Sequence, residues 1–189
     1  MTIDTYIVFY TKKNPKKYGE IIKEYEKEID EKLPNISTVM GIHSEPRTIF
    51  GEEYYHVGIA TDYNPYASYF YEEDGYPIEE AEQIAKRNTQ ILLDTAKKVI
   101  KLIQPEFGFG DIHNKIEDYV IELEKLEKRK YKKKYKNVKE YLSHITDNFT
   151  KLPWLFVYNE DLDIKISDKV KWYEDDEYIV WKEPKIYKI

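Results

Sequence analysis

PEFGFGDIHNK, residues 105–115, is the stretch that decides how the two halves of this chain are joined. It lies between two segments with helical periodicity, and it alternates two phenylalanines with two glycines before an Asp-x-His pair. Glycines supply the positive φ angles that a tight reversal requires. The stretch therefore predicts a hinge between two helices, with Phe107 and Phe109 anchored in the core. Asp111 or Asn114 would then cap the helix that follows.

The segment upstream of the hinge predicts the order strand, helix, strand, strand. Residues 4–13 are β-branched and aromatic, as in a buried strand. Apolar residues then recur every three or four positions up to Leu33-Pro34, which indicates an amphipathic helix. Residues 37–43 and 53–62 are predicted strands, separated by a short run at Arg47–Phe50 that Glu45-Pro46 and Gly51 delimit.

Long helical patterns occupy most of the remaining chain. One helix is predicted from about Ile78 to Ile103, where Pro105 stops it. A helical period restarts at Ile116, and a heptad-like seam runs from Tyr131 to Phe149. Either one helix or two with a break near Lys136-Asn137 fits this pattern. The last residues predict strands, with a β-hairpin whose turn is the acidic cluster Glu174–Glu177.

These elements predict an α+β fold in a single domain, residues 1–189. The sheet would be antiparallel or mixed, with a β-α-β-β start and a C-terminal β-hairpin, and two to four long amphipathic helices would pack on one of its faces. Tyrosines in the seam from 131 to 149 disfavour a tight coiled-coil dimer. A monomer is therefore favoured, with a dimer through that seam as the alternative.

Composition excludes several classes of site and protein. The chain has 189 residues and no cysteine, which rules out disulfides, cysteine-based zinc sites and thiol nucleophiles. The start, MTIDTYIVFYTKK, has no basic region and only a short apolar run, and no segment has the length of a membrane span. A cytoplasmic protein is expected. Abundant charged residues and few methionines are typical of heat-adapted proteins, although an AT-rich coding sequence would also enrich Lys, Ile and Tyr.

No cofactor or nucleophile motif is present. The sequence lacks a P-loop, a dinucleotide-binding glycine motif, H-E-x-x-H and G-x-S-x-G, so no cofactor is expected. His43 and His56 lie on adjacent predicted strands, where they would face each other or point to opposite faces. A two-histidine phosphoesterase would need a repeated His-x-Ser/Thr motif, and His56 does not carry one. His144 has the right neighbours but lies in a helical pattern.

Asp111 and His113 are candidate catalytic residues. With Glu106, Glu117 and Asp118 nearby, they could hold a divalent metal for a hydrolase or nuclease, with His43 or His56 as a further ligand or base. No complete set of metal ligands can be identified, and we assign no metal. The hinge interpretation is favoured because helix capping accounts for every polar residue of the stretch without a ligand.

Residues 128–136, KRKYKKKYK, form a strongly basic segment in an acidic chain. Without its seven positive charges the formal net charge of −6 would be −13. Such asymmetry is typical of a surface that binds the phosphates of nucleic acid. The alternative is a solvated helix face on which lysine stems cover the seam. The candidate nucleic-acid-binding residues are Lys128, Arg129, Lys130, Lys132, Lys133, Lys134 and Lys136.

Residues 53–77 are rich in tyrosine, which provides large and rigid contact area at recognition surfaces. Glu72, Glu73 and Asp74 would repel a phosphate chain, so this segment suits a protein partner better than RNA. The alternative is an ordered loop packed over the sheet. The candidate partner-binding residues are Tyr63, Tyr66, Tyr69, Phe70, Tyr71 and Tyr76.

The sequence thus favours a non-catalytic protein that binds another macromolecule, of the inhibitor, immunity or adaptor type. Binding of nucleic acid through residues 128–136 is the second hypothesis. A metal-dependent hydrolase or nuclease using Asp111 and His113 is the third. Since no motif of catalysis is complete, an enzyme is the less favoured class.

Overall fold

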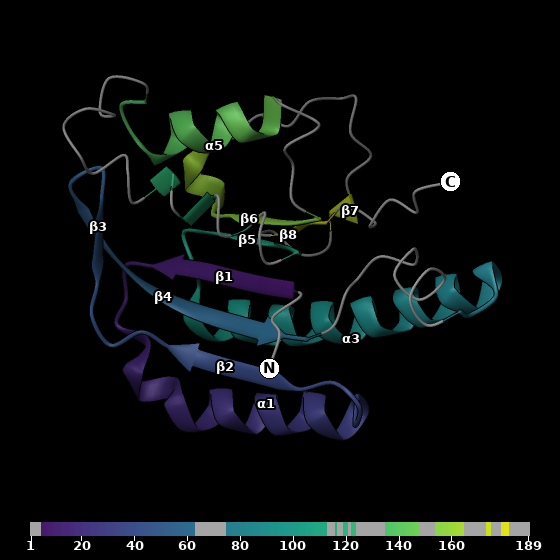
Figure 1. Ribbon diagram of the computed structural model, residues 1–189. Helices are drawn as coiled ribbons and strands as arrows, with labels where there is room; N and C mark the ends of the chain where they lie inside the picture. Colours follow the sequence, from purple (N-terminus) through teal and green to yellow (C-terminus); the bar gives the residue numbers. More distant parts are fainter. Residues whose placement is uncertain are drawn as a thin grey trace.

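The computed structural model shows an antiparallel sheet between helical layers (Figure 1). It describes residues 5–62, 75–112, 116, 119–120, 122–123, 135–147, 154–164, 173–174 and 179–181. The described helices are η1 (Pro15–Tyr18), α1 (Gly19–Lys32), α3 (Ile78–Ile103), α5 (Val138–Asp147) and η3 (Glu160–Leu162). The described strands are β1 (Thr5–Thr11), β2 (Thr38–Ile42), β3 (Arg47–Ile49), β4 (Glu52–Thr61), β5 (Phe107–Ile112), β6 (Leu155–Tyr158), β7 (Tyr173–Glu174) and β8 (Ile179–Trp181). None of these helices combines the length and the apolar character that crossing a membrane requires.

The strands form one sheet in the order β2-β4-β1-β5-β6-β8-β7, and β3 pairs with the first residues of β4. Every pairing is antiparallel. The predicted α+β class is confirmed. The strand-helix-strand-strand start is confirmed in part, because the short run at Arg47–Phe50 contributes a further strand, β3, between the two predicted strands. Strands β7 and β8 pair at the C-terminal end, as the predicted hairpin requires. Glu174, expected in the turn, belongs to β7, and the rest of the expected turn, residues 175–177, lies outside the described residues.

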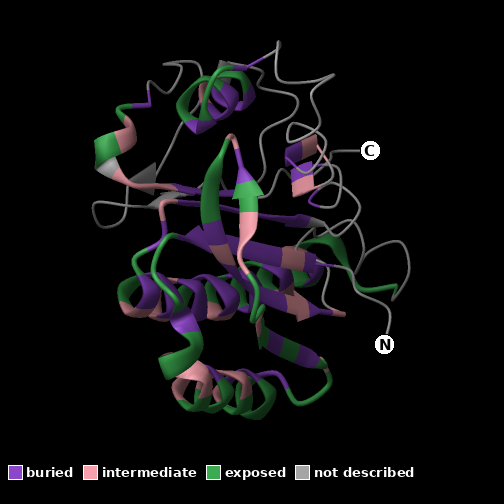
Figure 2. Ribbon diagram, turned by 90° about the vertical axis from the view of Figure 1, so that its left-hand side faces the viewer, coloured by how far each residue is buried: buried purple, intermediate pink, exposed green. Residues whose placement is uncertain are grey.

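Helices cover both faces of the sheet, so the expectation of helices on one face is wrong. Helices α1 and α3 pack against one side, here called the lower face, around Ile7, Phe9 and Val57. Helix α5 packs against the other, the upper face, around Val8 and Tyr10. Figure 1 shows α5 on the opposite side of the sheet from α1 and α3, and Figure 2 shows the strands buried between these layers.

The reason for this double cover is visible in β1. Alternate residues of a strand point to opposite faces. In β1 Ile7 and Phe9 belong to the lower core, Val8 and Tyr10 belong to the upper core, and each of the four is at most 2% exposed. A strand that is apolar on both sides must be covered on both sides. The continuous apolar run therefore predicts two helical layers, not one.

Residues 107–112 form the strand β5 between β1 and β6, so the predicted hinge is wrong. Phe107 and Phe109 do lie in the core, on the upper face. Gly108 and Gly110 point to the lower face, where the side chains of neighbouring strands fill the space that a Cβ would take. The glycines thus permit close packing across a central strand, which sequence reasoning mistook for the flexibility of a reversal.

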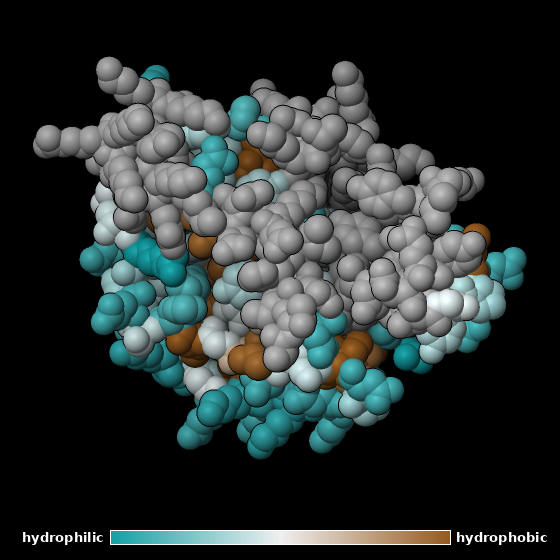
Figure 3. All heavy atoms as spheres, viewed as in Figure 1, coloured by the Kyte–Doolittle hydropathy of each residue, from teal (hydrophilic) through white to brown (hydrophobic). Residues whose placement is uncertain are grey.

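Helix α3 occupies the residues that its apolar period predicted, Ile78–Ile103. Helix α1 lies beside the edge strand β2, and its Glu26 side chain accepts a hydrogen bond from the Met40 backbone N–H. Met40 lies between the β2 residues whose N–H groups pair with β4, so this bond occupies an outward-pointing edge donor. A carboxylate placed there discourages another strand from pairing with the edge. Figure 3 shows the hydrophilic residues along the lower rim, where α1 lies.

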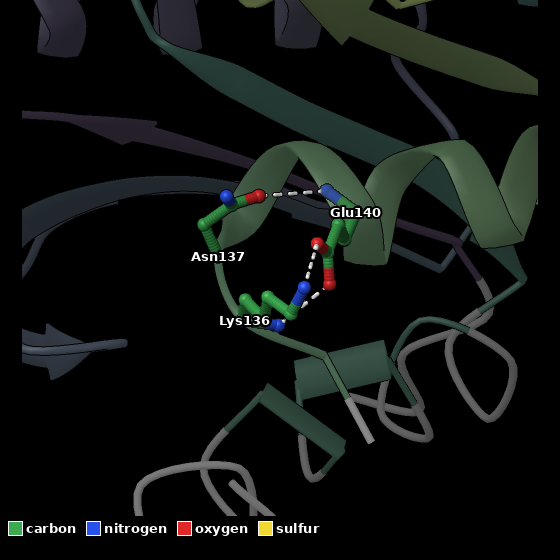
Figure 4. Close-up of polar contacts among 3 residues, drawn as sticks. All are labelled: Lys136, Asn137 and Glu140. Atoms are coloured by element: carbon green, nitrogen blue, oxygen red, sulfur yellow. Dashed lines mark hydrogen bonds and ion pairs between the residues drawn. The ribbon is translucent and has the colours of Figure 1, made fainter. Parts of the chain in front are cut away.

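Helix α5 begins at a cap, which answers whether the seam from 131 to 149 is one helix. The Asn137 Oδ1 atom accepts a hydrogen bond from the Glu140 N–H at 2.9 Å, and Glu140 Oε2 accepts one from the Lys136 N–H at 2.8 Å (Figure 4). This reciprocal arrangement marks a helix N-terminus. Of the two alternatives that the sequence left open, the break near Lys136-Asn137 is the one observed. Tyr135 packs against Tyr141 from outside the helix.

We expect Gly108→Ala to lower the free energy of unfolding by several kcal/mol, because an added Cβ would lie 2.8 Å from the Val8 carbonyl oxygen and 2.7 Å from a Phe9 ring carbon. Gly41→Ala is the matched control, since a Cβ on this strand glycine meets nothing within 4 Å. Urea denaturation of both variants gives the comparison. Equal stabilities would show that β5 does not need glycine at this position.

Candidate functional site

His43 and His56 face each other on the upper side of the sheet. The β2–β4 register continues one step beyond Ile42, where the His43 backbone N–H donates to the His56 carbonyl oxygen at 3.0 Å. Directly opposed residues point to the same face. The two imidazoles are stacked, with ring centroids 3.6 Å apart and planes at 28°. Of the two arrangements left open by the sequence, the facing pair is the one observed.

Arg47 joins this pair from the start of β3. It is paired with Tyr54 in the β3–β4 register, and Tyr54 lies two residues before His56, so all three point to the same face. Burial lowers the pKa of His43 and of His56, and the positive charge of Arg47 adds to this effect. Burial raises the pKa of the Tyr6 and Tyr10 phenols, and the same charge offsets part of that rise. One guanidinium therefore acts on four polar aromatic side chains. We call Tyr6, Tyr10, His43, Arg47 and His56 the Arg47 cluster.

Gly58 allows Tyr6 to reach the cluster. Tyr6 lies on β1 opposite Ala60, and its ring leans along β4 to cover Gly58. A Cβ on Gly58 would lie 2.6 Å from the Tyr6 hydroxyl oxygen, so a larger residue there would require the Tyr6 ring to move. The hydroxyl consequently sits directly over the β4 backbone, two residues from His56.

Burial divides the cluster into a covered base and an open side. His56 is 4% exposed and Tyr10 is 2% exposed, whereas His43 is exposed and Tyr6 and Arg47 are half-buried. Burial, with smaller effects of His43 and Arg47, lowers the pKa of His56 to about 3. Burial and Arg47 also lower the pKa of His43. Both imidazoles are therefore predominantly neutral at pH 7.

The buried Nδ1 atom of His56 has no hydrogen-bond partner among the described residues. A buried polar atom without a partner costs about 1–3 kcal/mol of stability. Neighbouring side chains satisfy each other instead. The Tyr54 hydroxyl donates to Glu52 at 2.7 Å, Lys12 lies 2.9 Å from the same carboxylate, and Tyr10 stacks on Phe107 at 4.7 Å. The cluster is thus bordered by side chains that contact one another, and His56 Nδ1 is left without a partner among the described residues.

Asp111 is remote from the two histidines of this cluster, although it lies beside Tyr6. It is opposite Tyr6 on β1, whereas His56 is opposite Tyr10 on the other side of β1. Four residues of strand separate them by roughly 13 Å along β1, and two strand spacings add roughly 10 Å across it. No single metal ion could be held by both. Asp111 is fully buried, and its Oδ2 atom accepts a hydrogen bond from the Trp154 N–H at 3.2 Å.

The other residues predicted from sequence fall mostly outside the described part of the chain. Tyr76 is 38% exposed just before α3, and Lys136 belongs to the cap of α5. Within the described residues, no group of three or more histidines or carboxylates is arranged to hold a metal ion. Outside the described residues lie His113, Tyr63, Tyr66, Tyr69, Phe70, Tyr71, Lys128, Arg129, Lys130, Lys132, Lys133 and Lys134.

Sequence reasoning identified the two histidines but missed Arg47, Tyr6 and Tyr10. The signal in the sequence was the alternation of side chains between the two faces along β1, β3 and β4. This alternation shows which residues share a face only when the register of β1 and β3 against β4 is known, because a shift of one residue moves every side chain to the other face.

Comparisons with known proteins give no match. No family model, no curated protein and no solved structure is similar to this chain. The Arg47 cluster has therefore to be interpreted from its own geometry.

We expect the free energy of unfolding to fall as the pH is lowered from 6.5 towards 3, because His56 binds a proton much less readily in the folded than in the unfolded chain. Between pH 7 and pH 5 this linkage should cost about 2 kcal/mol, and His56→Gln should remove that part of the loss. Chemical denaturation at both pH values measures the difference. His144→Gln, at an exposed position of α5, should retain the full pH dependence. Equal losses in the His56→Gln and parent proteins would contradict the assignment.

Proposed function

We propose that this protein binds a ligand carrying a phosphate group and does not chemically alter it. The phosphate would lie against Arg47 on the upper face of the sheet. The observation that carries the proposal is the position of Arg47, which the strand register places on the same face as Tyr6, Tyr10, His43 and His56.

The residue types of the open side suit an oxyanion. A guanidinium offers paired N–H donors in a fork that matches phosphate geometry. The neutral imidazole of His43 and the phenol of Tyr6 each add an N–H or O–H donor. All three side chains are partly or fully exposed, so a ligand could reach them from solvent. Tyr6, His43 and Arg47 come from β1, the end of β2 and β3, and backbone pairing of each strand with β4 holds them in place, which limits the entropy lost on binding.

Charge favours an anion over a metal ion at this place. Two stacked imidazoles could ligate a transition metal, but a cation beside them would be repelled by Arg47. A phosphate would instead gain from that charge. It would also favour a proton on His43, since a nearby anion raises the pKa of an imidazole.

The pKa values favour binding over catalysis. A general base is most effective when its pKa lies near the working pH. His56, with a pKa of about 3, is a weak base at pH 7, and the pKa of His43 is also below its ordinary value. This supports the non-catalytic class proposed from the sequence. A protein partner for the tyrosine-rich segment and nucleic acid for residues 128–136 remain separate proposals that rest on sequence.

We expect inorganic phosphate to bind the protein at pH 7 and Arg47→Gln to weaken this binding about tenfold or more, since a hydrogen bond to a charged group contributes about 1.5–3 kcal/mol. Phosphorus NMR titration or calorimetry at low ionic strength measures both affinities. Arg87→Gln is the matched control, because Arg87 is an exposed arginine of α3, the helix that packs on the lower face. If the parent protein does not bind phosphate, or if the two variants bind it equally, the proposal fails.

A further inference from the structure

The upper face of β2 continues from His43 into an open apolar strip. Alternation places Val39 and Gly41 on the same face as His43, and the register sets them opposite Ala60 and Gly58. Val39 is 52% exposed, and a Cβ on Gly41 would meet nothing within 4 Å. We call Val39, Gly41 and Ala60 the β2 strip.

The described helices leave this strip uncovered. The upper core takes residues from β1, β3, β4, β5 and β6, and none of its described members comes from β2. On the lower side the same strand is well covered, because Met40 is buried against α1 and α3. One strand is thus packed on one face and exposed on the other, immediately beside the Arg47 cluster.

The boundaries of the strip match a flat ligand. The ring of Tyr6 lies over Gly58 and forms one wall, and the exposed ring of His43 stands at the end nearest Arg47. The floor consists of backbone and small side chains, so a planar group could approach closely. Aromatic rings favour edge-to-face or offset contacts with walls of this kind.

We propose that the ligand of the Arg47 cluster is a small phosphate monoester with an aromatic body, and that this body lies on the β2 strip. The inference rests on the proposed function, since Arg47 holds the phosphate. Charge complementarity sets the orientation of the ligand, with its charged end at Arg47 and its apolar end over Gly41. The buried Nδ1 atom of His56, which has no partner in the described part of the chain, lies at the charged end beside His43.

Phenyl phosphate and methyl phosphate test the inference, because they share the phosphate monoester and differ in the aromatic body. Calorimetric titration of the full chain should give phenyl phosphate an affinity at least about tenfold higher than that of methyl phosphate, a difference that burial of one ring can supply. Val39→Ser and Gly41→Leu should both reduce this ratio towards one. The first removes apolar surface, and the second fills the open space above the strand.

Ile78→Ser is the control for the strip. Ile78 is as exposed as Val39, at 54%, but lies at the start of α3. This variant should keep the ratio of the parent protein. Urea denaturation of all three variants verifies that they fold, and Gly41→Leu has open space for its side chain.

Each outcome separates the two proposals. If both probes bind equally to the parent protein, the aromatic body is not recognised and the inference fails while phosphate binding stands. If neither probe binds, the proposed function itself fails. If the ratio of the two affinities is unchanged in Val39→Ser and Gly41→Leu, the ring binds elsewhere and the assignment of the β2 strip as its site is wrong. A phosphotyrosine peptide that binds more than tenfold tighter than phenyl phosphate would show that the ligand is a protein, which contradicts a small monoester.

Discussion

The close packing of side chains across β5 is the constraint on which the rest of the structure depends. Gly108 and Gly110 have no side chains, and Phe9, Ile7 and Leu155 occupy the space beneath them. Here the strands of residues 5–61 meet those of residues 155–181, since β5 pairs with β1 on one side and with β6 on the other. A larger residue would have to push these neighbours apart. The continuous pairing of the sheet through β5 therefore depends on glycine at both positions.

The geometry of the candidate site is set by the strands in the first half of that sheet. No helix supplies any member of the Arg47 cluster; β1, β3, β4 and the end of β2 do. The turn between β3 and β4 fixes where Arg47 stands, and both of its central residues, Phe50 and Gly51, have positive φ angles. Such turns match the twist of a hairpin. Strand register therefore determines which side chains meet in the site, and apolar packing on the lower face stabilises that register.

Much of the fold could be predicted from sequence because helical and strand periods are local signals. The apolar stripe from Ile78 to Ile103, the helical period before Leu33 and the strand-like runs of the first 62 residues correspond to observed elements. The function of Gly108 could not be read in this way, because glycine permits both reversal and close approach, and only the neighbouring strands distinguish them. Likewise His43 and His56 were visible as candidates, whereas Arg47, Tyr6 and Tyr10 join them only through pairings between distant segments.

The position of β1 in the middle of the sheet has a consequence for synthesis. Strand β1 precedes its partners β4 and β5 by about 50 and 100 residues in the sequence. As the chain emerges from the ribosome, β1 has no β5 partner until residue 112 is available, and β6 follows only at residue 155. An apolar central strand that waits for its partners is exposed to wrong pairings in the meantime. If β1, α1, β2 and β4 fold early as one unit, β1 is paired with β4 soon after synthesis. Its other edge is then paired only when β5 is available.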